Sequence, residues 1–318
     1  MMVSRMTGKT DFRYEYFSSV TQRKIEWLWY PYIPYGKLTI LQGDPGEGKS
    51  TFILNIAALL TRGKPMPDGF PVPAPQRVIY QTAEDNLSDT VKPRLISAGA
   101  DCEKIAYIVD EDSSLTLEDT RIEEIIRQTG ARLFILDPLQ AYLSRDSDMF
   151  SAGRMRQQLK KLADTAAKFK CAVVLIGHMN KASGEKNLYR GLGSIDIATI
   201  ARSVLMLSRD STDPSTRYMF PVKSSLAPEG QTIAFTFDRK RGLRWIGTRN
   251  VDKHQLEDYE THEGKSVLAR RIMRELLEEA DMRSSDILKK LKLMGISERT
   301  AHSVKKELVI TSYKSDGI

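Results

Sequence analysis

The stretch GDPGEGKST, from Gly43 to Thr51, places three glycines just before a lysine and two hydroxyl side chains. This spacing fits the G-x-x-x-x-G-K-[ST] pattern, whose backbone N–H groups curl around phosphates. We expect Lys49 to reach the terminal phosphates of ATP and the Ser50 hydroxyl to bind Mg²⁺. The competing interpretation is a glycine-rich turn that matches by accident. The residues predicted to contact the nucleotide are Gly43, Asp44, Gly46, Glu47, Gly48, Lys49, Ser50 and Thr51.

Hydrolysis also needs an acid that orients the metal, and Asp137 is the candidate. It ends the apolar run RLFILD. This position places its carboxylate at the carboxyl edge of a parallel sheet, beside the phosphate loop. The alternative role is an ordinary turn aspartate ahead of Pro138.

Two further strand ends carry candidates for activating water and for contacting the terminal phosphate. Glu84, in RVIYQTAEDN, is predicted to act as the general base, with Asp85 as its close competitor. Both acids would otherwise cap the next helix. His178 ends CAVVLIGH, where its imidazole is predicted to contact the terminal phosphate. The alternative is a purely structural histidine.

These candidates require strands that end at one edge of a sheet. Short apolar runs alternate with helical patterns from KLTIL to CAVVLIGH, which predicts an α/β fold with a mostly parallel sheet. Met155, Leu159, Leu162, Ala163 and Ala166 recur at helical spacing and predict the apolar stripe of a scaffold helix. The later runs SVLMLS, RYMFPV and TIAFTF predict antiparallel strands at the end of the sheet.

Composition places the chain among ordinary globular proteins. With 318 residues, 41% hydrophobic and 28% charged, we expect about two domains and little disorder. The net charge of +7 favours a polyanionic partner, although such an excess is also common on solvated surfaces. Cys102 and Cys171 fit neither a disulfide framework nor a zinc site and predict buried thiols. The charged amino terminus and the lack of a long apolar run favour a cytoplasmic protein without a membrane partner.

The division we expect is a phosphate-loop domain over residues 1–247, a polar linker over 248–264 and a helical unit over 265–318. The last unit has three helix-like segments, and Ser297 is predicted to cap the third. Eight basic and three acidic residues lie between Arg283 and Lys314. This outline favours a winged-helix-like helix-turn-helix that contacts DNA, and the alternative is a small bundle for protein contact. The basic residues predicted to contact DNA are Arg299, Lys305 and Lys306.

Together the motifs resemble a known family. GDPGEGKST, TAED, LFILDPLQAYL, VVLIGHMNK and YRGLGSIDIATIARSVL are similar to those of RecA-type ATPases of the plasmid RepA helicase group, relatives of the DnaB-type replicative helicases. The resemblance covers residues 25–240 and implies a RecA-like sheet flanked by helices. It also implies roles for five residues, namely Lys49 and Ser50 in Walker A, Asp137 as the Walker B acid, Glu84 as the catalytic glutamate and His178 as the sensor.

The same resemblance implies a ring of identical subunits, with a hexamer as the expected size. In such rings a neighbouring subunit inserts a basic finger, for which Arg202 and Lys223 are candidates. The DnaB-type pattern has an arginine two positions after that lysine, whereas this chain has Ser225. Loops after the strands would point into a central channel and grip single-stranded DNA, and the alternative for them is plain flexible surface. The loop residues expected to do so are Lys181, Lys186 and Arg190.

The function expected from these features is a Mg²⁺-dependent ATPase that moves along single-stranded DNA as a replicative helicase of a phage or mobile element. One alternative is a recombination mediator that remodels DNA without unwinding it. Another is a nucleotide-switched regulator whose C-terminal unit reads a DNA sequence.

Overall fold

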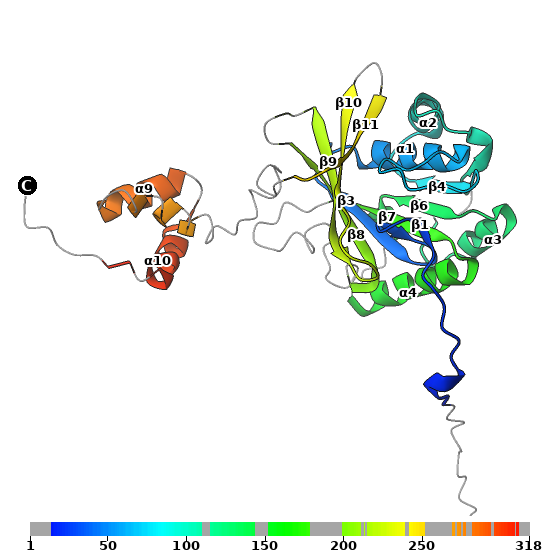
Figure 1. The fold of residues 1–318 in the computed structure, drawn as a ribbon, viewed down its shortest axis with the longest axis horizontal. Helices are drawn as coiled ribbons and strands as arrows, with labels where there is room; N and C mark the ends of the chain where they lie inside the picture. Colours follow the sequence, from blue (N-terminus) through cyan, green and yellow to red (C-terminus); the bar gives the residue numbers. More distant parts are fainter. Residues whose placement is uncertain are drawn as a thin grey trace, which may run out of the picture.

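Most of the structure is one large sheet with helices on both of its faces. The computed structural model describes residues 14–109, 115–143, 152–178, 199–210, 213, 215–238, 242–251, 269–270, 272–274, 276–277, 282–293, 296–308 and 310–311. Within these residues, nine strands pair in the order β11-β10-β9-β8-β3-β7-β6-β4-β5 (Figure 1). A separate antiparallel pair, β1 (Trp27–Trp29) and β2 (Ile33–Pro34), precedes them.

The part of the sheet from β8 to β5 is parallel, as the alternating runs predicted. The strands are β3 (Leu38–Gly43), β4 (Val78–Thr82), β5 (Ile105–Ala106), β6 (Leu133–Asp137), β7 (Ala172–His178) and β8 (Ser203–Arg209). Every residue of β3 and β6 is buried. Continuous burial explains why these strands are mostly apolar, since helices cover both faces of a parallel sheet.

The first of the three predicted antiparallel strands is antiparallel on one side only. SVLMLS lies in β8, which pairs parallel with β3 through Thr39 and Ser203 and antiparallel with β9. The long connection from β7 allows β8 to enter the sheet by a parallel crossover, whereas the next connections are short. The strands with only antiparallel neighbours are therefore β9 (Thr216–Ser224), β10 (Thr232–Asp238) and β11 (Gly242–Arg249).

The predicted domain boundary after residue 247 falls inside a strand. Thr248 and Arg249 still pair with Ile233 and Thr232 of β10. The sheet therefore extends two residues further than the loss of apolar periodicity indicated, because an edge strand needs no alternation of apolar residues to complete its hydrogen bonds.

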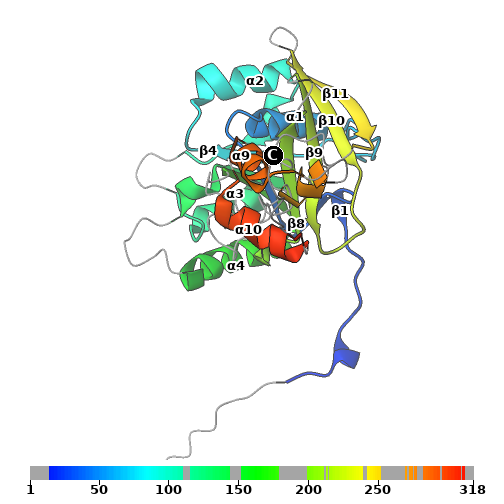
Figure 2. The same cartoon turned by 90° about the vertical axis from the view of Figure 1, so that its left-hand side faces the viewer.

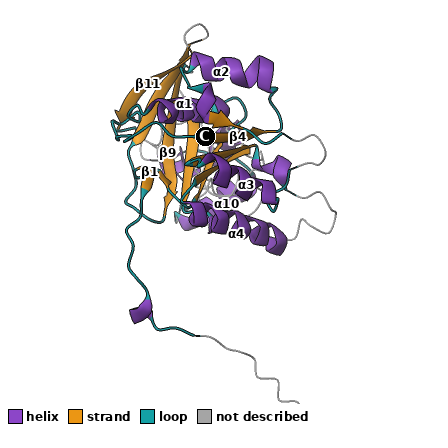
Figure 3. Ribbon diagram, turned by 90° about the vertical axis from the view of Figure 1, so that its right-hand side faces the viewer, coloured by secondary structure: helices purple, strands orange, loops and turns teal. Residues whose placement is uncertain are grey.

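Helices cover the two faces of the sheet in pairs. Figures 1 and 2 show α1 (Lys49–Arg62) and α2 (Lys92–Ser97) on one side, with α3 (Thr120–Thr129) and α4 (Ala152–Phe169) on the other. Each pair packs on its own apolar core. Figure 3 shows the resulting layers, with helices outside the strands. The predicted scaffold stripe lies on α4, where Leu159, Leu162 and Ala166 are buried.

The C-terminal helices have an apolar cluster of their own. α9 (Ser284–Leu293) and α10 (Glu298–Glu307) contribute Ile287, Leu291, Ala301 and Val304 to it. Ser297 caps α10 as predicted, since its hydroxyl oxygen accepts a hydrogen bond of 3.2 Å from the N–H of Thr300.

The two cysteines are free thiols in different environments. Cys171 is fully buried, and burial raises the pKa of its thiol to about 12, whereas Cys102 is only half-buried. Among the described residues, no helix combines the length and apolar character needed to cross a lipid bilayer.

Candidate nucleotide-binding site

The strand register brings the phosphate loop, Asp137 and His178 to the carboxyl ends of neighbouring strands, at one edge of the sheet. Gly43, the first residue of the phosphate loop, lies opposite His178 across β3 and β7. Asp137 ends β6 opposite Thr82 of β4, from which the chain continues to Glu84. Since β7 separates β3 from β6, the loop strand and the Asp137 strand lie two strand spacings apart, about 10 Å.

Glycine conformations shape the phosphate loop. Gly46 and Gly48 both have a φ of +84°, a region that favours glycine. A β-carbon on Gly48 would lie 2.3 Å from the Phe237 ring, whereas one on Gly46 would meet no atom within 4 Å. The loop is therefore closed against β10 at Gly48 and open at Gly46. α1 begins at the next residue, Lys49, so its first N–H groups and positive dipole end face the loop.

Lys49 is buried inside this loop. Its ammonium donates hydrogen bonds of 2.8 Å to the carbonyl of Gly43 and 2.9 Å to that of Asp44. Burial lowers the pKa of Lys49, while the negative charges of Asp137, Asp44, Glu47 and Glu84 act in the opposite direction. The strand register brings this loop and Asp137 to the same edge of the sheet, and the chain continues from Thr82, opposite Asp137, to Glu84.

Asp137 has a partner that its local sequence does not predict. The Tyr80 hydroxyl donates a hydrogen bond of 2.7 Å to a carboxylate oxygen of Asp137. Both residues are buried. Burial, followed by the adjacent negative charge of Asp137, raises the pKa of Tyr80 well above its usual range, so the phenol remains a donor. In the sequence Tyr80 is only one aromatic residue in a strand, and the strand pairing alone reveals its role.

Glu84 and Asp85, the two candidates for the general base, have different surroundings. Asp85 forms an ion pair of 2.5 Å with Arg94 of α2, whereas Glu84 is solvent-exposed and interacts electrostatically with Lys49. Neither acid caps the following helix. Asn86 does so, because its side chain accepts a hydrogen bond of 2.8 Å from the N–H of Ser88 at the start of η2 (Leu87–Val91).

Glu47 has surroundings that the loop pattern does not predict. Its carboxylate forms ion pairs of 3.0 Å with Arg209 of β8 and 3.3 Å with Arg217 of β9. The Arg217 guanidinium also lies 5.5 Å from the centre of the Phe237 ring, the ring that closes over Gly48. Sequence reasoning missed all three of these loop neighbours, which lie more than 150 residues further along the chain.

Arg202 and Lys223 lie at the other end of the strands, where β3 and β8 begin, and not at the end that carries the phosphate loop. The N–H of Arg202 bonds the carbonyl of Leu38, where β3 begins, and Lys223 pairs with Val204 near the start of β8. The Lys223 ammonium donates a hydrogen bond of 2.9 Å to the carbonyl of Ala201. Burial and the nearby Arg202 charge both lower the pKa of Lys223. About five residues of extended strand, roughly 17 Å, separate this edge from the phosphate loop.

The residues predicted to contact DNA are only partly described. Lys181, Lys186 and Arg190, and the side chain of His178, lie outside the described residues. On α10, Arg299 and Lys306 are exposed, whereas Lys305 is half-buried.

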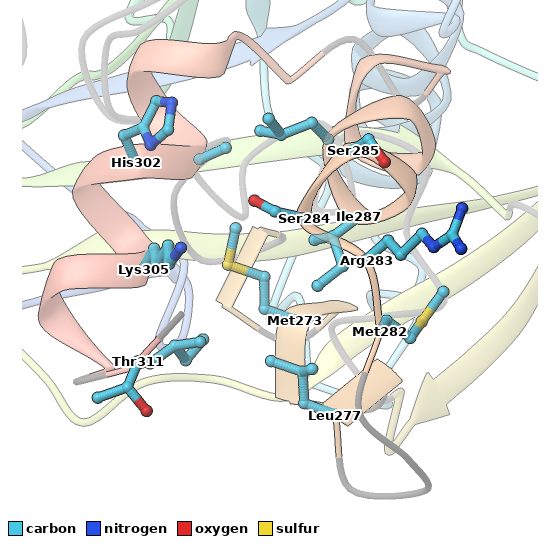
Figure 4. Close-up of a pocket in the computed structure, with 13 residues that line it drawn as sticks. Met273, Leu277, Met282, Arg283, Ser284, Ser285, Ile287, His302, Lys305 and Thr311 are labelled. Carbon is cyan, nitrogen blue, oxygen red and sulfur yellow. The ribbon is translucent and has the colours of Figure 1, made fainter. Parts of the chain in front are cut away.

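Lys305 and His302 line a cavity of about 540 Å³ within the C-terminal helices. In Figure 4 these two side chains lie along α10, across the cavity from Ser285 and Ile287, with Met273 and Leu277 between the two sides. The cavity is formed by the C-terminal helices themselves and includes none of the phosphate-loop residues.

The glycine-rich loop between β3 and the buried start of α1, with an acid ending β6, defines a P-loop nucleotide-binding domain of the RecA-like class. The model of an AAA domain family matches residues 10–184, more than half of the chain. The chain therefore belongs to this AAA domain family, and it carries a RecA-type ATPase domain.

Curated relatives and a solved structure are similar to parts of the chain. The DNA repair protein RadA of Mycobacterium tuberculosis (strain CDC 1551 / Oshkosh) is 25% identical over 149 residues, 46% of this chain and 28% of the relative. RadA of Halalkalibacterium halodurans is 26% identical over 148 residues, with the same shares. The chain thus spans less than a third of the length of these relatives. A KaiC-like protein from Pyrococcus horikoshii OT3 is 18% identical, with a TM-score of 0.49 over 67% of this chain and 90% of that one.

Proposed function

We propose that the chain is a Mg²⁺-dependent ATPase that couples ATP hydrolysis to movement along single-stranded DNA, as a replicative helicase of a phage or mobile element. The observation that carries the ATPase part is the geometry of the buried Lys49, which is bonded to the carbonyls of Gly43 and Asp44, at the sheet edge where Asp137 ends β6. A phosphate-binding cation, a metal-orienting acid and a base are the groups that this reaction needs from the protein.

The residues fit a nucleotide and a divalent cation. The loop is open at Gly46, where a phosphate can approach the backbone. Ser50 and Asp137 would hold Mg²⁺, which supplies charge neutralisation on the phosphates when bound. Lys49 binds the terminal phosphates, Glu84 takes a proton from the attacking water, and His178 contacts the terminal phosphate.

Self-assembly into a ring, with a hexamer as the proposed size, is supported by the positions of Arg202 and Lys223. Both lie at the edge of the sheet away from their own phosphate loop. A basic group at that edge contributes to hydrolysis only if it reaches the site of a neighbouring subunit. We assign the finger role to one of these two residues.

DNA is the proposed polyanionic partner. The curated relatives carry the name DNA repair protein, and the exposed Arg299 and Lys306 on α10 offer two cations on one helix. We propose that residues 248–264 link the ATPase domain to a DNA-binding helix-turn-helix in residues 265–318. The loop cations Lys181, Lys186 and Arg190 would grip the single strand.

The test is ATP turnover with and without single-stranded DNA, combined with strand displacement on a forked duplex. We expect DNA to raise turnover severalfold and the duplex to unwind only with ATP and Mg²⁺. DNA-independent turnover would contradict the proposal. Turnover that responds to DNA without strand displacement would favour the second candidate, a recombination mediator that remodels DNA without unwinding it.

A further inference from the structure

Glu47 places a negative charge inside a loop proposed to receive phosphates. Its side chain is only 6% exposed, so little water screens the carboxylate. A carboxylate in this position would repel a nucleotide unless other charges cancel it. The loop therefore needs a source of positive charge in addition to Lys49.

Two arginines from the sheet supply that charge. Arg209 of β8 and Arg217 of β9 lie directly opposite each other in the antiparallel register. Like charges in such positions destabilise a sheet when nothing lies between them. Here the Glu47 carboxylate contacts both, at 3.0 Å from Arg209 and 3.3 Å from Arg217. The three side chains therefore form a cluster with one negative and two positive charges, a net charge of +1.

The cluster is built into the fold. The Arg217 side chain is 10% exposed and the Arg209 side chain 31%, so the pairing occurs largely away from solvent. Arg217 also contacts the face of Phe237, which closes over Gly48. Buried charges of this kind are retained only when they are paired, and removal of Glu47 would leave the two arginines facing each other without the carboxylate between them.

We propose that Arg209 and Arg217 are positioning residues for nucleotide binding, which act through Glu47 to give the phosphate loop a net positive charge. This inference rests on the proposed nucleotide-binding function. It assigns to β8 and β9 an electrostatic contribution to phosphate affinity, made through Glu47. A purely structural ion pair would only anchor the loop, and the two roles predict opposite effects of neutralising Glu47 on nucleotide affinity.

The experiment measures the Kd of Mg·ADP and of a non-hydrolysable ATP analogue by calorimetry for Arg217→Gln, Glu47→Gln and the double variant. We expect Arg217→Gln to weaken binding at least about tenfold, because it lowers the net charge of the cluster from +1 to 0. Glu47→Gln should tighten binding about threefold, and the double variant should bind within about threefold of wild type. Arg244→Gln, which changes an exposed arginine on β11, is the matched control.

Rescue of binding in the double variant supports the electrostatic role. If Arg217→Gln and Glu47→Gln weaken nucleotide binding equally, and the double variant does not restore it, the ion pairs are a structural anchor and the proposal is overturned. Nucleotide affinity that is unchanged in the Arg217→Gln variant would also overturn it. If thermal melting shows that Arg217→Gln does not fold, the same comparison with the more exposed Arg209→Gln decides. Wild-type protein that binds neither nucleotide would refute the proposed function itself, before any variant is compared.

Discussion

The Tyr80 hydroxyl and the Asp137 carboxylate join two neighbouring strands by a hydrogen bond of 2.7 Å. Tyr80 lies opposite Ile135 on β6, and Asp137 follows two residues later on the same face of that strand. The long phenol bridges this diagonal offset. The bond therefore fixes the carboxylate that the proposed Mg²⁺ site requires.

Replacement of Tyr80 by phenylalanine should weaken Mg²⁺ use. The variant loses a hydrogen bond to a buried charge, worth about 1.5–3 kcal/mol. We expect turnover to fall about tenfold and the half-saturating Mg²⁺ concentration to rise. Tyr32→Phe is the control, since it also removes a buried hydroxyl, one that donates to the carbonyl of Gln231. Identical Mg²⁺ titrations for the Tyr80 variant and wild type would contradict this role.

The burial of Lys49 predicts a pH dependence of stability. Burial lowers the pKa of Lys49 in the folded chain. Between that value and the ordinary lysine pKa, the unfolded chain therefore binds more protons than the folded chain. The free energy of unfolding of nucleotide-free wild type, relative to Lys49→Met, should then rise with pH across this alkaline window and be constant below it. Denaturant unfolding of both proteins from about pH 7 to about pH 10.5 measures the difference. If the free energy of unfolding of wild type, relative to Lys49→Met, falls as the pH rises through this range, then burial does not lower the pKa of Lys49.

Glu84 and Asp85 should differ in catalysis. Glu84→Gln removes the proposed base and should reduce turnover about 10²- to 10⁴-fold while nucleotide binding persists. Asp85→Asn breaks a partly exposed ion pair with Arg94, so its cost should be at most about 1 kcal/mol of stability. Steady-state turnover and nucleotide affinity, measured on both variants, check the assignment. A larger loss of turnover in the Asp85 variant would reverse it.

Mixed subunits should identify the finger. Arg202→Ala and Lys223→Ala proteins are each mixed with Glu84→Gln protein, and ATP turnover is measured across mixing ratios. At a shared site, a subunit with an intact base and a neighbour with an intact finger together restore turnover. We expect rescue for one of the two finger variants. Turnover no higher than the sum of the separate proteins for both mixtures would exclude Arg202 and Lys223 as fingers.

The parallel core of the sheet, and the edge of it that carries the phosphate loop and Asp137, were predictable from the sequence because both depend on local signals. Continuous apolar runs indicate strands buried on both faces, and the polar residue that ends each run must lie at the carboxyl edge. Gly43 and Asp137 could therefore be assigned to the same edge of the sheet. The Ser297 cap was equally predictable, since it is a contact between residues three positions apart.

What the sequence could not reveal depends on pairings between distant strands. Arg209 and Arg217 contact Glu47 only because β8 pairs with β3 and then with β9. In the sequence they are two ordinary surface-type residues near strand ends. The parallel entry of β8 is equally invisible locally, because strand propensity does not distinguish a parallel from an antiparallel neighbour.

The position of β8 beside β3 has a practical consequence for anyone who shortens this chain. A fragment that ends at residue 184, the limit of the AAA domain match, would omit β8 and the strands beyond it. β3 would then become an edge strand with unpaired N–H and C=O groups, and the apolar residues that pack against Leu205 and Leu207 would face water. Such a truncation is expected to aggregate on expression, so the shortest useful ATPase fragment should extend through Arg249.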